Sequence, residues 1–183
     1  MPFQVRLATN ADIPTLHALI EASVRVLQAG DYTPAQIEGA LGTILGLDTQ
    51  LIKDETYYVV EATNDAGQAV ITACGGWSKR ATLFGADRTK TGADPLLDPA
   101  TQPARIRAFF VDPAVPRQGL GRRLMEHCES KAAAAGFQVM ELAATMPGVP
   151  LYRACGFEVV EEFALALPDD VSVPLSRMRK RIG

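Results

Sequence analysis

Residues 105–137 read RIRAFFVDPAVPRQGLGRRLMEHCESKAAAAGF, and this stretch decides the order of elements in the second half of the chain. A β-rich run ends at Asp112-Pro113, a loop passes through Pro116, and a helix is expected to begin at Gly119. Apolar residues then recur at helical spacing, as they do on an amphipathic surface helix. The pattern predicts a strand, a loop and a helix in direct succession, with the helix ending at Gly136.

The start of this helix is suited to binding a diphosphate. The first N–H groups of a helix have no partner within it and lie at the positive end of its dipole. Gly119 and Gly121 carry no Cβ, so a phosphate can approach those N–H groups closely. Arg117, Arg122 and Arg123 add positive charge beside the same turn. We therefore predict an anion site between residues 116 and 123.

Two other phosphate-binding loops do not fit this segment. The G-x-x-x-x-G-K-[ST] loop of nucleotide triphosphatases does not occur in the chain. The dinucleotide fingerprint G-x-G-x-x-G needs a small residue at position 124, where this chain has leucine. Taken alone, the two glycines would more often mark a tight turn before a surface helix. The unbroken succession of strand, Asp-Pro, arginine and glycines favours a binding loop.

The rest of the chain predicts a mixed α/β order with one strand–helix–strand crossover. Alternating apolar residues indicate strands, and apolar residues three and four apart indicate helices. Residues 78–103 show no clear period, and so long a segment without structure usually carries function or is disordered. Strands are expected at residues 3–7, 56–62, 69–77, 105–111, 137–144, 159–167 and 171–178, and helices at 13–27, from Pro34 through Ile37, Leu41, Ile44 and Leu45, at 119–135 and around 150–154.

Length and composition fit one ordinary domain over residues 1–183, with 48% hydrophobic and 21% charged residues. The net charge of −3 gives no support for binding nucleic acid or an anionic membrane. The three cysteines, Cys74, Cys128 and Cys155, lie far apart, which argues against a disulfide framework and a zinc site, and no other metal is expected. The N-terminus lacks the pattern of a signal peptide, so we expect a cytoplasmic protein.

The 105–137 segment resembles the acetyl-CoA signature of the GCN5-related N-acetyltransferases, in which [Q/R]-x-x-G-x-[G/A] follows a strand. Gly119 and Gly121 match the two small positions, whereas Pro116 stands at the first position. Downstream, residues 151–157 (LYRACGF) resemble a later motif of the family, a short helix bearing Leu-Tyr followed by Gly-Phe. The resemblance implies a central twisted, mostly antiparallel sheet flanked by helices, with a V-shaped split between its two central strands.

The resemblance also implies the site. Acetyl-CoA would bind along the strand at 105–111, where an N–H group near Phe110 or Val111 polarises the acetyl carbonyl. Thr145 stands where the family often has an asparagine. The implied cofactor-binding residues are Phe109, Phe110, Val111, Arg117, Gln118, Gly119, Leu120, Gly121, Arg122, Arg123 and Thr145.

In relatives, an amine attacks the thioester directly, and the tyrosine of the later motif protonates the departing thiolate. Tyr152 is therefore the expected general acid. The general base is not identified, because Glu61 and Glu141 are better explained as solvated or salt-bridged strand carboxylates. The alternative functions are a non-catalytic acyl-CoA sensor and a structural interaction protein.

The acceptor is expected to be a small-molecule or peptide amine. Trp77, Arg80 and Phe84 mix apolar and basic groups in the segment 75–99, and a substrate wall and a plain surface loop explain them equally well. Tyr32 is a further candidate, since the first two helices line acceptor sites in relatives. Homodimers are common among those relatives, but the sequence does not show whether this chain forms one.

Overall fold

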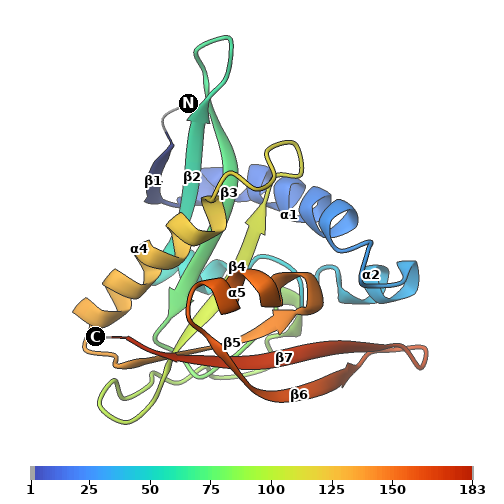
Figure 1. The fold of residues 1–183 in the computed structure, drawn as a ribbon, viewed down its shortest axis with the longest axis vertical. Coiled ribbons are helices and arrows are strands. Elements are labelled where there is room, and N and C mark those ends of the chain that lie inside the picture. Colours follow the sequence, from blue (N-terminus) through green and yellow to red (C-terminus); the bar gives the residue numbers. More distant parts are fainter. Residues whose placement is uncertain (1–2, 183) are drawn as a thin grey trace.

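The computed structural model describes residues 3–182, which build a seven-stranded sheet in the order β1-β2-β3-β4-β5-β7-β6 (Figure 1). Neighbouring strands are antiparallel except β4 and β5, which run parallel. The mixed α/β class and the mostly antiparallel sheet are thus confirmed. The strands are β1 (Gln4–Leu7), β2 (Tyr57–Thr63), β3 (Ala69–Ser78), β4 (Ala104–Val111), β5 (Val139–Thr145), β6 (Glu158–Ala166) and β7 (Ser172–Arg181).

The predicted split lies between β4 and β5. The two strands pair only at their beginnings, through Ala104 with Met140 and Arg105 with Glu141, and they diverge beyond that point (Figure 1). At the closed end, the buried Glu141 accepts hydrogen bonds from Arg105 at 2.6 Å and from Arg179 of β7 at 2.5 Å. One carboxylate shared by two arginines ties three strands together where the split begins.

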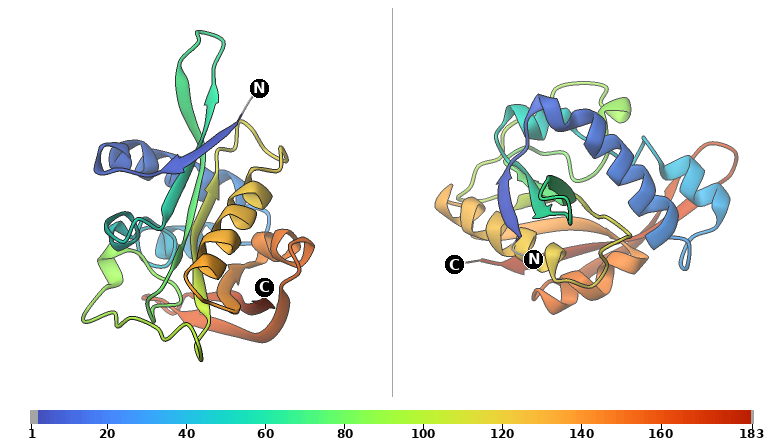
Figure 2. Two further views of the ribbon diagram at one scale, coloured as in Figure 1. Left: turned by 90° about the vertical axis from the view of Figure 1, so that its left-hand side faces the viewer. Right: turned by 90° about the horizontal axis from the view of Figure 1, so that it is seen from above.

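Helices cover both faces of the sheet (Figure 2). Helix α1 (Ile13–Leu27), α2 (Pro34–Ala40) and α3 (Thr49–Lys53) contribute to a core against one face. Helix α4 (Leu120–Ala134) packs on the other face, and α5 (Val149–Ala154) follows β5 beside the split. Four residues of the apolar stripe predicted for α4, Leu120, Leu124, Cys128 and Ala132, lie in the core together with Met125, whereas the fifth, Ala135, is exposed.

The second helix is shorter than its apolar pattern predicts. It ends at Ala40, because Leu41 has extended backbone (φ −60, ψ 127) and the chain turns there. Ile44 and Leu45 therefore lie in the turn rather than on a helix. The sequence also gave no indication of α3, whose five residues are too few to show a period.

The segment 78–103 is irregular but anchored. Arg80 donates two hydrogen bonds to Asp54, at 2.6 and 2.9 Å, and pairs with Leu96 in an isolated bridge. Arg107 of β4 donates to the carbonyl oxygens of Thr82 and Gly85. Side chains from neighbouring elements thus fix this segment, which forms no extended ladder of backbone hydrogen bonds. No helix within residues 3–182 is both long enough and apolar enough to cross a bilayer.

Candidate active site

The loop before α4 has the backbone shape predicted for an anion site. Gly119 is the N-cap of α4 with φ 75, and a Cβ at this position would find no atom within 4 Å. Arg117, two residues earlier, also has a left-handed backbone (φ 59). No side chain caps the helix, so the N–H groups of Leu120, Gly121 and Arg122 point out without a partner in the helix. Successive N–H groups in such a turn form a concave anion-binding surface.

The second glycine of the loop has a packing role. Gly121 is buried, and a Cβ there would lie 2.8 Å from Cδ2 of Leu151 on α5. The predicted role of this glycine was to let a phosphate approach, but in the structure its lack of a Cβ permits contact between α4 and α5. Leu120 is likewise a core residue, only 2% exposed. Their contribution to an anion site is limited to their backbone N–H groups.

The other predicted loop residues are exposed. Gln118 and Arg117 lie on the surface of the turn. Arg122 donates to the carbonyl oxygen of Ala154 at 3.3 Å, and Arg123 donates to that of Phe3 at 3.4 Å. Both bonds are long and solvent-exposed, so both guanidinium groups are available to a phosphate at low cost.

A bulge in β4 shapes the split. Arg107 pairs with Gly76 and Phe110 pairs with Cys74, so Ala108 and Phe109 both face the single residue Gly75. Ala108 has a left-handed backbone (φ 53), which is rare for a residue other than glycine. The Phe109 ring rests on Gly75, where a Cβ would lie 2.5 Å from Cδ2 of the ring. The bulge and the glycine together place the Phe109 ring in the split.

The residues expected to polarise the acetyl carbonyl lie beside Phe109. Phe110 is 6% exposed and packs in the core on the α1 side. The N–H of Val111 donates to the hydroxyl of Ser23 on α1 at 3.3 Å, a long bond that a better acceptor could replace. A cavity on this side of the split is lined by all three of these β4 residues together with Thr145 and Tyr152.

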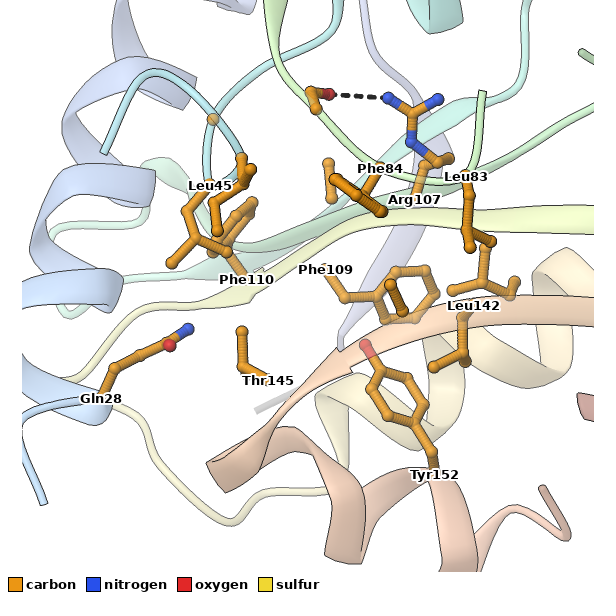
Figure 3. A pocket seen from close by; sticks show the side chains of 16 residues that line it. Gln28, Leu45, Leu83, Phe84, Arg107, Phe109, Phe110, Leu142, Thr145 and Tyr152 are labelled. Atoms are coloured by element: carbon orange, nitrogen blue, oxygen red, sulfur yellow. Dashed lines mark hydrogen bonds between the residues drawn. The ribbon is translucent and has the colours of Figure 1, made fainter. Parts of the chain in front are cut away.

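Tyr152 lies on α5 with its hydroxyl directed into the split (Figure 3). Its ring packs edge-on between Phe109 and Phe157, with centroids 6.4 and 6.1 Å away. The hydroxyl makes no hydrogen bond to any other of residues 3–182. Burial raises the pKa of Tyr152, so the phenol keeps its proton at neutral pH. The side chain is therefore an uncommitted proton donor.

A second cavity borders the first and shares five lining residues with it, Gln28, Phe109, Phe110, Thr145 and Tyr152 (Figure 3). Of the four residues predicted to bind the acceptor, Phe84 lines this cavity and stacks on Phe163 at 6.1 Å. Trp77 lies in the core against Phe137, and Arg80 is bound to Asp54. Tyr32 is buried, donating to the carbonyl oxygen of Pro174 and accepting from the N–H of Met146. The structure therefore brings only Phe84 of this set to the cavity.

Several lining residues were not found by sequence reasoning. They come from four elements or loops. Among them, only Arg107 stood out in the sequence, because it is a charged residue in a mostly apolar strand. Arg107 donates to Asp48 at 3.0 Å, and its burial lowers the pKa of its guanidinium. The residues missed include Gln28, Leu45, Arg107 and Leu142.

Neither carboxylate considered as a base is free. Glu141 is held by Arg105 and Arg179, and Glu61 accepts from Arg6 at 2.6 Å. The interpretation of both as salt-bridged strand carboxylates is confirmed. Within residues 3–182, no group of three His, Cys, Asp or Glu side chains is placed to hold a metal ion.

Comparison with known proteins decides the family. A sequence model of the acetyltransferase (GNAT) domain matches residues 53–159, which is more than half of the chain. The chain belongs to the GNAT acetyltransferases. As a GNAT protein it is an acyltransferase, in agreement with the resemblance of its loop and tyrosine motifs. No curated protein matches its sequence significantly.

Solved GNAT structures share the fold. A GCN5-related N-acetyltransferase from Rhodopseudomonas palustris superposes with a TM-score of 0.69 and 15% identity, covering 98% of this chain and 95% of that one. The PaiA N-acetyltransferase from Thermoplasma acidophilum, solved with coenzyme A, gives 0.62 and 14%, with 99% of both chains covered. The yncA protein of Salmonella typhimurium, solved with its cofactor acetyl-CoA, gives 0.62 and 17%, over 99% and 94% of the chains. At these identities the likeness establishes the fold alone.

Proposed function

We propose that this GNAT protein transfers the acetyl group of acetyl-CoA to an amine at the split between β4 and β5. The observation that carries the proposal is the free hydroxyl of Tyr152. It lies between two cavities, one reaching the start of α4 at Gly121 and the other reaching Phe84 and Leu83. A donor from one side and an acceptor from the other would meet at this hydroxyl.

The residues beside the first cavity fit acetyl-CoA. The diphosphate would accept hydrogen bonds from the uncapped N–H groups of Leu120 to Arg122, with Gly119 leaving space for it. The exposed arginines Arg117, Arg122 and Arg123 would supply charge. The pantetheine arm would follow the unpaired edge of β4, where the strand has left β5.

Bound acetyl-CoA supplies an activated thioester, whose C–S bond breaks as a C–N bond to the amine forms. The chain contributes alignment and proton control. The bulge at Ala108 orients the β4 backbone toward the split, and the N–H of Val111 can exchange Ser23 for the acetyl oxygen. Tyr152 donates its proton to the sulfur atom, and its phenolate regains a proton from the nitrogen, which loses one as the amide forms.

The test is acetyl-CoA binding by calorimetry together with thiol release over a panel of amines. We expect binding, thiol release with at least one amine, and a kcat for Tyr152→Phe lower by about 10²-fold or more, as for loss of a general acid. The affinity for CoA should change little. Absence of CoA binding would contradict the proposal. CoA binding without turnover of any amine would favour the acyl-CoA sensor.

A further inference from the structure

The cavity between Tyr152 and Phe84 carries no acidic side chain. Sixteen residues line it, and Arg107 is the only one with a charge. Arg107 is itself compensated, because it pairs with the buried Asp48, and Asp48 also accepts from Lys90 at 2.6 Å. No carboxylate oxygen therefore faces the space that an acceptor would occupy. A second ammonium group on the acceptor would be buried beside an arginine without a partner.

One polar side chain in this cavity lacks a partner. Gln28 at the C-terminal end of α1 is 9% exposed, and its Oε1 is buried without a hydrogen bond within residues 3–182. The side chain reaches from α1 into the cavity toward Thr145 (Figure 3). A buried acceptor without a donor is unfavourable, and a ligand that supplies the donor removes that cost.

The backbone of Gln28 is held firmly. Its carbonyl accepts from the N–H groups of Asp31 and Tyr32, at 3.1 and 3.0 Å. The hydroxyl of Tyr32 in turn joins this turn to Pro174 and Met146, on the far side of the split. The carboxamide is thus presented from a fixed point, and Tyr32 has a positioning role in place of the direct contact predicted from the sequence.

We propose that the acceptor is a monoamine with an uncharged body, whose reacting nitrogen donates a hydrogen bond to Oε1 of Gln28 once the carboxamide turns that buried atom toward the cavity. The body would lie against Leu83, Phe84 and Leu142. The carboxamide of Gln28 is uncharged, so it can accept a hydrogen bond from the neutral amine, which is the form that attacks the thioester. Polyamines and aminoglycosides would be poor acceptors, because the cavity offers no carboxylate for their additional ammonium groups. This inference rests on the acetyl transfer proposed above.

The first test compares amines that differ by one charge. Pentylamine and 1,5-diaminopentane have the same carbon chain, as do 4-methylbenzylamine and 4-(aminomethyl)benzylamine in an aromatic pair. We expect kcat/KM to favour the monoamine of a pair by about tenfold or more, because an unpaired buried ammonium is unfavourable. Equal rates, or a preference for the diamine, would overturn the inference while leaving acetyl transfer established. Loss of CoA binding would instead contradict the proposed function.

The second test removes the unpaired acceptor atom. Gln28→Met keeps the length of the side chain, so the amine KM should rise about tenfold. The KM for acetyl-CoA should rise less, although Gln28 also lines the cavity assigned to acetyl-CoA. Without ligands this variant should melt about 2 °C higher or more, since a buried unsatisfied atom is gone. The matched control is Gln138→Met, an exposed glutamine outside both cavities, with no change in either quantity. A lower melting temperature of Gln28→Met with an unchanged amine KM would show a purely structural role.

Discussion

The hydroxyl of Tyr57 donates a hydrogen bond to the carbonyl oxygen of Ala108 at 2.8 Å. Ala108 is the β4 residue with left-handed backbone, a conformation unfavourable by about 1–2 kcal/mol for residues with a Cβ. Tyr57 is fully buried, and burial raises the pKa of its hydroxyl well above its usual value. A buried hydrogen bond from β2 thus stabilises the bulge that places Phe109 in the split.

Tyr57→Phe should impair both stability and catalysis. The substitution leaves the Ala108 carbonyl without its donor, so the free energy of unfolding should fall by about 1–3 kcal/mol. The bulge should relax, and kcat should fall more than CoA affinity. Urea unfolding and steady-state kinetics measure both effects. Tyr58→Phe is the control, because Tyr58 is the next residue on β2 and packs on the α4 side of the sheet. Equal activity losses in the two variants would contradict this role.

Gly119→Ala should weaken CoA binding beyond its effect on stability. A matched control exists in Gly67, which has φ 76 against 75 for Gly119 and likewise has no atom within 4 Å of a Cβ. Both alanines should therefore lower the free energy of unfolding by about 1 kcal/mol through backbone strain. Only the change at Gly119 should lower CoA affinity, as measured by calorimetry, because Gly67 lies in the β2–β3 turn. Equal affinity in both variants would remove the loop from the cofactor site.

Asp48→Asn should loosen the segment 78–103. The buried Asp48 carboxylate accepts hydrogen bonds from Arg107 and Lys90. Its neutralisation leaves the buried Arg107 uncompensated and leaves Lys90 with only its longer pair to Asp94, at 3.9 Å. Breaking such a buried pair lowers the free energy of unfolding by about 3–5 kcal/mol. Limited proteolysis should then cut within the segment. Glu21→Gln, which breaks an exposed pair with Arg25, should change stability by less than about 1 kcal/mol. Similar small effects of both substitutions would contradict the anchoring role.

The pH dependence of kcat should show no loss of the Tyr152 proton at ordinary pH. Burial disfavours the phenolate and raises the pKa of Tyr152 above the usual value of about 10. The proton is therefore present at all pH values below about 10 and is lost only above it. A pH–rate profile of the wild type and Tyr152→Phe tests this. An alkaline loss of activity centred below pH 9, present only in the wild type, would contradict it.

The sequence by itself determined most elements and the position of the glycine-containing loop before α4. Local patterns were sufficient to predict this loop, because the first N–H groups of a helix that begins at Gly119 have no partner in the helix wherever the helix lies in the fold. The motif of Tyr152 was also local, but its placement beside Phe109 is visible only in the structure. Periodicity failed at α3 and at the end of α2, where elements are too short or where a turn interrupts the apolar pattern.

Which residues line the proposed acceptor cavity was decided only by the tertiary structure. Arg80 and Tyr32 carry suitable chemistry, but their polar groups already have partners from distant parts of the chain. Trp77 packs against Phe137 in the core, outside this cavity. Gln28 carries no sequence signal, and it becomes notable because the fold buries its oxygen without a donor. Whether a polar group is satisfied depends on contacts between residues far apart in sequence, which no local pattern encodes. The same reason separates Gly121, needed for packing against Leu151, from Gly119, whose surroundings are open.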